Sequence, residues 1–296
     1  MEKVYEGNLV EVFKITDRLY FRRANLPIRS QCNSAFIVGD NGIAVVDAPP
    51  GGIEMVEETE KIFGKPITAL FLTHGHGDHA GGLEDFLNWN FPQGLTIYCS
   101  QRFLETFSPA EHTYEANFVG VDGILQIVFS GGVEIELFTA RDIMHSKWDM
   151  FIRIPGPDVF CTGDTVVEFQ SAYFHSADIS SWISNLRVLS DRRGKYILAG
   201  HGQELFPWSY INEFTTYLEK LQHAANACKE LYRPDPTLTE KERFADVSTG
   251  EIKKLVNAFF SEDRNDIQYI EERAGKEHAQ REVRMILWAL IRSFIR

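Results

Sequence analysis

Three histidines and one aspartate lie within six residues of this chain, directly after an apolar run that predicts a β-strand. The run is ITALFLT at 67–73, and it is followed by His74, His76, Asp78 and His79, with intervening glycines that allow a tight turn. Given the histidine and aspartate content of the chain, HxHxDH would arise in fewer than about one in a thousand shuffled sequences. A solvated histidine-rich loop is the alternative interpretation, but the position between a strand and a helix favours a metal site.

The spacing of this motif leaves room for two ions. In an extended turn, His74 and His76 project to the same side, whereas Asp78 and His79, at the start of the next helix, point elsewhere. A closed structural zinc site would need four protein ligands around one ion, whereas a catalytic site keeps one position for water. One loop can therefore serve two ions.

The first 205 residues otherwise predict an α/β fold in which short strands alternate with brief helices. A hairpin is expected where AFIV and IAVV flank the turn GDNG at 39–42. Further strands are expected at 67–73, 95–99, 124–128, 133–138, 150–154, 159–162 and 195–199, and helices at about 53–63, 81–90, 101–107 and 180–190. A long loop is expected at 108–123, between a helix and a strand.

Strand signals stop after Pro207, so residues 206–296 predict a helical C-terminal extension. Apolar residues recur at alternating spacings of three and four, the pattern of one buried helix face: Ile211, Phe214, Leu218, Leu221, Ala225 and Cys228. Pro234 and Pro236 end this helix, and at least two further helices are expected in 239–296.

The last of these helices is apolar almost all round. One stripe consists of Val283, Leu287, Leu290 and Phe294, and the intervening directions hold Ile286, Trp288, Ala289 and Ile291. Apolarity on several sides implies burial against a second surface. That surface is either the helix at 208–231 of the same chain or the same segment of a second chain, and the additional apolar area at 259–260 and 269–270 favours a homodimer.

The motif resembles the HxHxDH signature of the metallo-β-lactamase superfamily, and this resemblance implies three later ligands in order. His145, Asp164 and His201 fit, because each follows a predicted strand. Taken singly, each is more often structural than a ligand. Their order and their position at the C-terminal ends of strands make them candidates for the same site.

The resemblance to the metallo-β-lactamase superfamily covers about residues 10–205. It implies an αββα sandwich of two mixed β-sheets flanked by helices over residues 1–205. It also implies a dinuclear metal centre, with Asp164 as the bridge and Asp47 bracing the metal loop from a neighbouring strand. In that assignment the first ion is held by His74, His76 and His145, and the second by Asp78, His79 and His201.

The resemblance further implies a hydrolase. Two divalent ions lower the pKa of a shared water towards neutrality, and the resulting hydroxide attacks a carbonyl or phosphoryl centre that one ion polarises. The affinity order favours zinc, with iron or manganese as alternatives. Asp164 would neutralise charge on both ions, and Asp78 would orient the hydroxide or relay its proton. Tyr173 and His175 are candidates for donating to a leaving oxygen or contacting a small-molecule substrate, and packing is their alternative role.

Several branches of the superfamily fit this chain less well. Diiron oxygen reductases resemble a pattern with glutamate at the position of His76 and carry a flavin-binding domain that this length cannot hold. Secreted zinc β-lactamases usually have a cysteine ligand before the last histidine, and residues 165–200 contain no cysteine. Nucleases typically add a large inserted domain and basic grooves. We therefore expect hydrolysis of a small carboxylic ester, lactone or thioester, and the alternative is a ligand-binding or regulatory protein that keeps the metal centre with little turnover.

Charge and cysteine content limit the expected partners and compartment. The chain has 30 basic and 42 acidic side chains, a formal net charge of −12, and no cluster of basic residues, so no nucleic acid partner is expected. The longest apolar runs are too short to span a membrane and the first residues lack a signal-peptide pattern, so no membrane association is expected. Four widely spaced cysteines without a CxxC motif are typical of a reducing compartment, which predicts a cytoplasmic protein.

Overall fold

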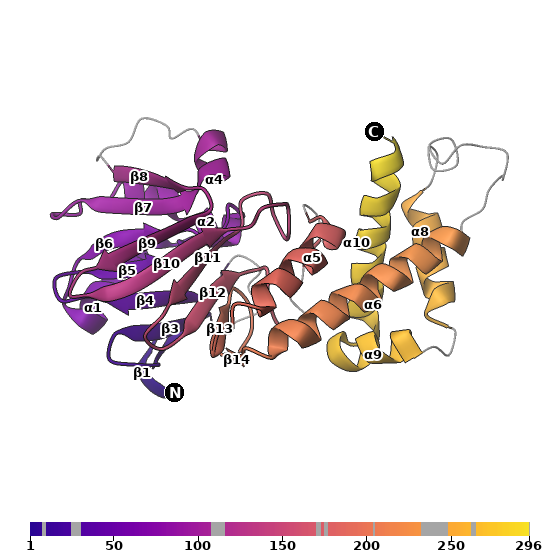
Figure 1. The fold of residues 1–296 in the computed structure, drawn as a ribbon, viewed down its shortest axis with the longest axis horizontal. Coiled ribbons are helices and arrows are strands. Elements are labelled where there is room, and N and C mark those ends of the chain that lie inside the picture. The colour runs from indigo at the N-terminus through magenta and orange to yellow at the C-terminus, as the bar shows by residue number, and fades with distance from the viewer. Residues whose placement is uncertain are drawn as a thin grey trace.

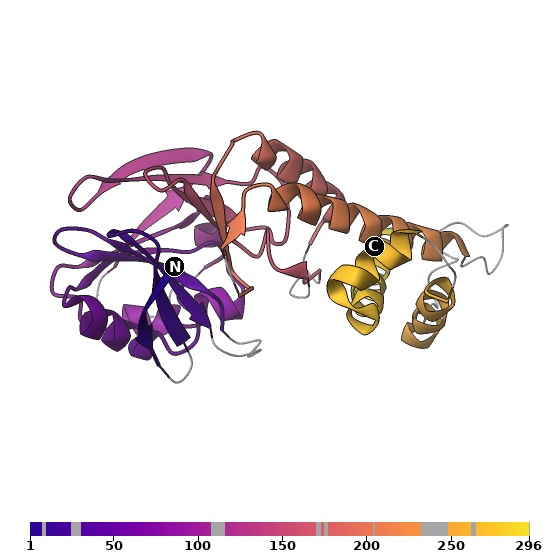
Figure 2. The same ribbon diagram turned by 90° about the horizontal axis from the view of Figure 1, so that it is seen from below.

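The computed structural model describes residues 1–7, 10–24, 31–107, 116–169, 173–174, 177–203, 205–231, 248–261 and 265–295. Two β-sheets lie face to face with helices on their outer sides, and the C-terminal helices stand beside them (Figure 1). The view from below separates the two sheets as layers (Figure 2). The expected sandwich of two mixed sheets with flanking helices and a helical C-terminal region is confirmed.

The first sheet contains eight strands in sequence order: β1 (Glu2–Glu6), β2 (Val10–Lys14), β3 (Leu19–Ala24), β4 (Ser34–Val38), β5 (Ile43–Val46), β6 (Ile67–Phe71), β7 (Leu95–Ser100) and β8 (Ala116–Val121). Strands β1 to β5 pair antiparallel, and β5 to β8 pair parallel. The predicted hairpin forms between β4 and β5. The parallel half carries helices between its strands, as parallel pairing requires.

The second sheet has the spatial order β14-β13-β12-β11-β10-β9. Its strands are β9 (Ile124–Phe129), β10 (Val133–Thr139), β11 (Met150–Ile154), β12 (Val159–Gly163), β13 (Tyr196–Ala199) and β14 (Phe206–Pro207). Only the pair β12 and β13 is parallel among these neighbours. The crossover between these two strands contains α5 (Ile179–Ser190), whose side chains pack on the outer face of this sheet.

Apolar side chains fill the space between the sheets. Phe21 and Phe71 of the first sheet and Leu137 and Ile152 of the second belong to this buried cluster. Burial of each side chain of this size contributes about 1.5–3 kcal/mol relative to exposure. On the outer face of the first sheet, a second cluster joins the strands to helices α1 (Gly52–Phe63), α3 (Leu83–Leu87) and α4 (Gln101–Thr106).

Two parts of the strand prediction need correction. The expected loop at 108–123 is wrong for residues 116–121, which form β8 and pair in parallel with β7. Asn117 and Gly120 weaken the strand signal there, but backbone hydrogen bonding to β7 overrides this local preference. Residues 108–115 lie outside the described part of the chain. The three strands β1 to β3 were not expected from the sequence.

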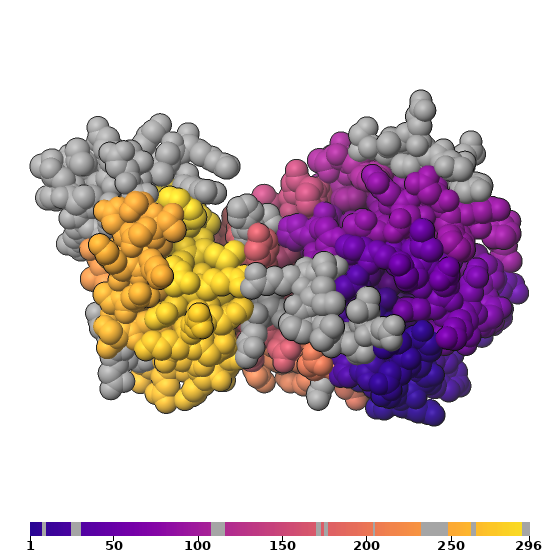
Figure 3. All heavy atoms as spheres, turned by 180° about the vertical axis from the view of Figure 1, so that it is seen from behind, coloured from indigo at the N-terminus to yellow at the C-terminus, as the bar shows by residue number. Residues whose placement is uncertain are grey.

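The C-terminal helices share one hydrophobic core with the second sheet. They are α6 (Tyr210–Leu231), α8 (Thr249–Phe259), α9 (Asn265–Ala274) and α10 (Lys276–Ile295), and Figure 3 shows the last three as a lobe beside the sheets. The predicted stripe of α6 is buried along its length. The core cluster continues across residue 205, and the proposed domain boundary there stays a prediction.

One side of α10 packs within its own chain, and it includes Val283 and Leu287 of the expected stripe. Leu290 is only partly buried, and the side chain of Phe294 lies outside the described part of the chain. Val283, Ile286, Leu287 and Ile291 are buried in the cluster that also contains the buried faces of α6, α8 and α9. The neighbouring helix of the same chain thus covers this side of α10, and the homodimer stays a prediction. Within the described residues, no helix is long and apolar enough to cross a membrane.

A buried polar contact joins α6 to α10. The hydroxyl of Tyr217 donates a hydrogen bond to the Glu282 carboxylate, and His278 Nε2 lies 3.2 Å from the other carboxylate oxygen. Glu282 is 1% exposed, and burial raises the pKa of its carboxyl. The contact therefore satisfies a polar group that would otherwise be costly inside an apolar core.

Tyr217→Phe is expected to lower the free energy of unfolding by about 1–3 kcal/mol, because it removes the donor to a buried carboxyl without emptying its space. Chemical denaturation followed by circular dichroism measures this loss. Tyr196→Phe, at a partly exposed position, serves as the control and should change stability little. Equal stability of the two variants would contradict the stabilising role of this contact.

Candidate metal centre

The predicted ligands come from loops that follow strands of both sheets. His74 follows β6 of the first sheet, and His76, Asp78 and His79 lie in the same loop and the short helix α2 (Gly77–Ala80). The loops after β10, β12 and β13 of the second sheet supply the other three, His145, Asp164 and His201. All seven side chains meet at one end of the sandwich and form two clusters. Within each cluster, the ligand atoms lie within 4.8 Å of one another.

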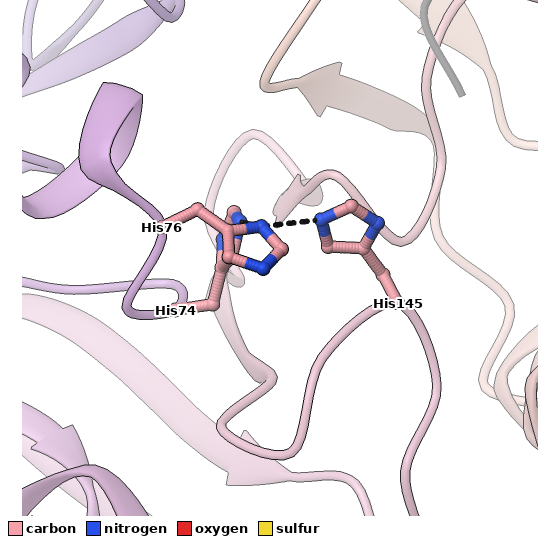
Figure 4. A group of neighbouring side chains, drawn as sticks. All are labelled: His74, His76 and His145. Carbon is pink, nitrogen blue, oxygen red and sulfur yellow. Dashed lines mark hydrogen bonds between the residues drawn. The ribbon is translucent and has the colours of Figure 1, made fainter. Parts of the chain in front are cut away.

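The first cluster consists of three imidazoles. His76 Nδ1 lies 3.1 Å from His74 Nε2 and 2.9 Å from His145 Nε2. Figure 4 shows the three rings pointing toward one another from two separate loops. His74 and His145 are buried, and His76 is partly buried. Three imidazole nitrogens facing one point form an open, three-ligand site of the kind that catalytic zinc uses.

The second cluster contains two imidazoles and two carboxylates. Asp78 Oδ2 lies 3.0 Å from His201 Nε2, and Asp164 Oδ1 lies 3.1 Å from His79 Nε2. The other Asp164 oxygen lies between the clusters, 3.5 Å from His201 Nε2 and 3.7 Å from His145 Nε2. Asp164 is therefore placed to contact ions in both clusters.

Asp47, which directly follows β5, fixes the loop that carries the histidine motif by hydrogen bonds to Thr73 and His79. Its carboxylate accepts hydrogen bonds from the Thr73 backbone N–H at 2.7 Å, from the Thr73 hydroxyl, and from His79 Nδ1 at 2.7 Å. The Thr73 hydroxyl donates its only proton to Asp47. It therefore accepts a hydrogen bond from His74 Nδ1, which lies 3.1 Å from Thr73 Oγ1. With Nδ1 donating in both rings, the neutral forms of His74 and His79 present Nε2 lone pairs to the two clusters.

Glycines allow the loops to approach this closely. A Cβ atom on Gly163, whose φ is +51°, would lie 2.5 Å from Thr73 Oγ1. A Cβ atom on Gly200 would lie 2.3 Å from Asp164 Oδ1 and 2.6 Å from His79 Cε1. Side chains at these positions would push the ligands apart, so the clusters depend on both glycines.

The two clusters differ in protonation. Burial lowers the pKa of His145 to about 3, and burial with the neighbouring imidazoles lowers the pKa of His74 well below its usual value. In the second cluster burial alone would lower the pKa of His201, but Asp164 and Asp78 outweigh it and raise that pKa to about 9. The pKa of Asp164 is held well below its usual value because His201 and His79 outweigh the effect of burial. His74 and His145 of the first cluster are thus neutral, whereas His201 of the second cluster is an imidazolium next to carboxylates.

The donor set fits two divalent ions. Nitrogen and carboxylate oxygen atoms at this spacing suit zinc, manganese or iron. In addition, two buried atoms of the second cluster, His79 Nε2 and Asp164 Oδ1, face each other at 3.1 Å without forming a well-aligned hydrogen bond. Buried polar atoms rarely stay unsatisfied, and a bound cation would satisfy both.

Metal binding is expected to release a proton from His201 of the second cluster and none from His74 or His145 of the first. At pH 7.5 His201, with its pKa near 9, must lose a proton before it can bind an ion, whereas His145 is already neutral. The affinity for the second ion should therefore rise by up to about tenfold per pH unit from pH 7 and level off above pH 9. Calorimetric titration in buffers of different ionisation enthalpy measures this. Equal proton release for both ions, or none, would contradict the assignment.

Of the two residues expected to contact a substrate, Tyr173 and His175, only Tyr173 lies in the described part of the chain. The Tyr173 ring lies perpendicular to the His76 ring with 6.2 Å between centroids, and the side chain is 40% exposed. Tyr173 is thus next to the first cluster and accessible from outside. His175 lies outside the described residues.

Sequence reasoning gave no role to three residues that border the clusters. Thr73 orients His74, and its only sequence signal is a hydroxyl directly before the first histidine. Trp148 lies with its ring centroid 6.3 Å from that of His76. Cys32, whose thiol pKa is raised by burial, offers a sulfur within 4.8 Å of ligand atoms of Asp47 and His79. No spacing in the sequence links Cys32 to the histidine motif.

Comparison with known proteins gives consistent matches. The family model of the metallo-beta-lactamase superfamily matches residues 27–201. A metallo-beta-lactamase type 2 of Elizabethkingia meningoseptica is 31% identical over 207 residues, which cover 65% of this chain and 78% of the relative. An atrochrysone carboxyl ACP thioesterase of Pseudocercospora fijiensis is 25% identical over 203 residues, 67% of this chain and 56% of that protein. A solved metallo-beta-lactamase from Pontibacter korlensis superposes with a TM-score of 0.59 at 18% identity, covering 71% of this chain and 99% of that one.

Proposed function

Because the chain belongs to the metallo-β-lactamase superfamily of metal-dependent hydrolases, we propose that it is a dinuclear hydrolase of a small carboxylic ester, lactone or thioester. The observation that carries the proposal is the position of Asp164, with one carboxylate oxygen between a three-imidazole cluster and a second cluster of mixed ligands. A carboxylate in this position can hold two ions close enough to share one water.

The residues assigned to the first ion are His74, His76 and His145, and those assigned to the second are Asp78, His79 and His201, with Asp164 shared. Zinc is the proposed metal, because affinity for imidazole-rich sites is higher for zinc than for iron or manganese. When bound, the ions would supply a hydroxide near neutral pH and would polarise the substrate carbonyl.

Asp78 is proposed to accept the proton of the nucleophilic hydroxide and to transfer it to the leaving group. Its Oδ2 lies 3.0 Å from His201 Nε2 and 3.8 Å from His79 Nε2. Burial acts to raise the pKa of Asp78, but the contact with His201 outweighs it and lowers the pKa. The carboxylate is therefore ionised at neutral pH and can accept a proton at Oδ2 and pass it to a leaving group.

Tyr173 is proposed to bind the substrate or donate to its leaving oxygen. Its partial exposure beside His76 leaves the ring accessible to a ligand that enters the first cluster. His175 is proposed for the same part of the pocket on sequence grounds alone.

Two arguments support acyl substrates: the sequence lacks features of other branches of the superfamily, and one relative is a thioesterase. The chain has no cysteine between Asp164 and His201 and no basic groove signal in its sequence. The match to an ACP thioesterase supports thioesters as one of the three candidate bonds. Its distance, at 25% identity, leaves the choice among ester, lactone and thioester to experiment.

The test is a metal analysis combined with a substrate panel. Zinc-loaded protein should contain close to two ions per chain by elemental analysis. It should hydrolyse at least one of three substrate groups: aryl esters, acyl-homoserine lactones and acyl-glutathiones. One ion or none would contradict the dinuclear centre, and hydrolysis of phosphodiesters alone would contradict the acyl substrate. Two ions without turnover of any substrate would favour the ligand-binding alternative.

A further inference from the structure

The turn that follows His145 is fixed by a buried carboxylate. Asp149 accepts hydrogen bonds from the Ser146 backbone N–H at 2.9 Å and from the Ser146 hydroxyl at 2.7 Å. The same hydroxyl accepts a bond from the Trp148 backbone N–H at 3.0 Å. Ser146 and Asp149 are buried, whereas Lys147 between them is exposed. The turn therefore exposes Lys147 and fixes the backbone of Trp148, next to the candidate metal ligand His145.

Trp148 is held in one orientation beside the first cluster. Its indole Nε1 donates to Thr106 Oγ1 at 3.0 Å, and its ring packs against Phe103 with 6.1 Å between centroids. The ring stands nearly perpendicular to the His76 ring at 6.3 Å. Trp148 is only partly buried, and its ring lies beside the cluster at which a substrate would react.

Lys147 places a positive charge over this indole. Its Nζ lies 4.8 Å from the centroid of the Trp148 ring, a distance typical of a cation–π contact. Within the described residues, no carboxylate pairs with this ammonium. The Trp148 ring under this ammonium also lies beside His76 of the first cluster, with 6.3 Å between ring centroids.

We infer that Lys147 and Trp148 form a recognition rim for an anionic substrate, in which an apolar or aromatic part contacts Trp148 and a carboxylate contacts Lys147. This inference rests on the proposed function, because it names the substrate class of the same site. An ammonium already resting on an aromatic face loses less freedom when it binds an anion than a freely moving lysine would. A flat, apolar group ending in a carboxylate matches the shape and the charge of this rim.

The test compares two acetate esters on zinc-loaded protein, 4-acetoxybenzoate and 4-acetoxybenzamide, which differ at one substituent: a charged carboxylate in the first and an uncharged amide in the second. The ratio of kcat/KM for the carboxylate over the amide should fall about threefold to tenfold in Lys147→Gln, mainly through KM. Lys195→Gln is the matched control. Lys195 also lies over an aromatic ring, that of Tyr196, at 5.2 Å, but at the end of β13 away from His201, so the ratio should not change. An unchanged ratio in Lys147→Gln would overturn the rim.

A binding experiment separates this inference from the proposed function. Calorimetry with the products 4-hydroxybenzoate and 4-hydroxybenzamide needs no turnover. Lys147→Gln should weaken binding of the carboxylate about threefold to tenfold and leave that of the amide unchanged. If neither ester is hydrolysed but this loss is seen, the rim stands and the proposed hydrolase activity fails for these esters. If the carboxylate does not bind, or binds equally well to Lys147→Gln, the rim is overturned whatever the activity.

Discussion

Asp164→Asn is expected to lower hydrolysis by at least about a thousandfold and to remove most of the second ion, with little change in the fold. The Asp164 carboxylate contacts both clusters, so the substitution removes the shared negative charge that would hold two cations close together. An amide can donate or accept hydrogen bonds but carries no charge to offset two ions. The first three-imidazole cluster remains complete in this variant, so one ion should stay bound.

The measurements are elemental analysis and kcat/KM after reconstitution with zinc, with circular dichroism as the check on folding. Asp191→Asn, an exposed carboxylate just after α5, is the matched control and should keep two ions and full activity. Activity of Asp164→Asn within a few-fold of the parent protein would contradict the bridging role. Loss of both ions would show that the two clusters do not bind independently.

Gly200→Ala is the second substitution expected to have a large effect, because one methyl group would collide with two ligands of the second cluster. Its Cβ would lie 2.3 Å from Asp164 Oδ1, 2.6 Å from His79 Cε1 and 3.0 Å from the backbone carbon of Gly163. The backbone around Gly200 cannot move away freely, since its N–H and carbonyl bond Gly163 and Asn33 at 2.8 and 2.7 Å. The ligands must therefore shift, and a shift of about 1 Å lowers activity about a hundredfold.

Gly77→Ala provides a sharp control for this variant. Gly77 lies between His76 and Asp78, yet a Cβ atom there meets no atom within 4 Å. The added methyl should leave metal content and kcat/KM nearly unchanged, while Gly200→Ala loses second-site metal and activity. Equal behaviour of the two variants would contradict the close packing described around Gly200.

The sequence predicted best where local pattern and tertiary structure agree. The motif His74 to His79 follows a strand whose apolar run is unambiguous, and α6 has the regular spacing of a helix with one buried face. The hairpin of β4 and β5 follows from its glycine-containing turn. In each case the backbone conformation is determined by residues close in sequence.

Features that depend on contacts between distant segments could not be predicted from spacing. His145 and His201 enter the site from a different sheet than His74, and only the resemblance to a known family grouped them before the structure did. Asp47 has a φ of 63°, an uncommon conformation for a residue other than glycine, and no local signal indicates it. The position of Trp148 beside His76 depends on packing against Phe103, which lies 45 positions earlier in the chain.

The arrangement of ligands also bears on how the molecule holds together. Each cluster combines side chains from the loop after β6 in the first sheet with side chains from loops of the second sheet. A bound ion would thus act as a cross-link between the two halves of the sandwich, in addition to the backbone hydrogen bonds from Met150 to Thr73 and from Asn33 to Gly200. Such an ion stabilises the folded chain in proportion to the logarithm of its free concentration. Chelation would then lower the stability of the folded chain as well as remove the reactive centre, so metal supply would affect the lifetime of the protein together with its activity.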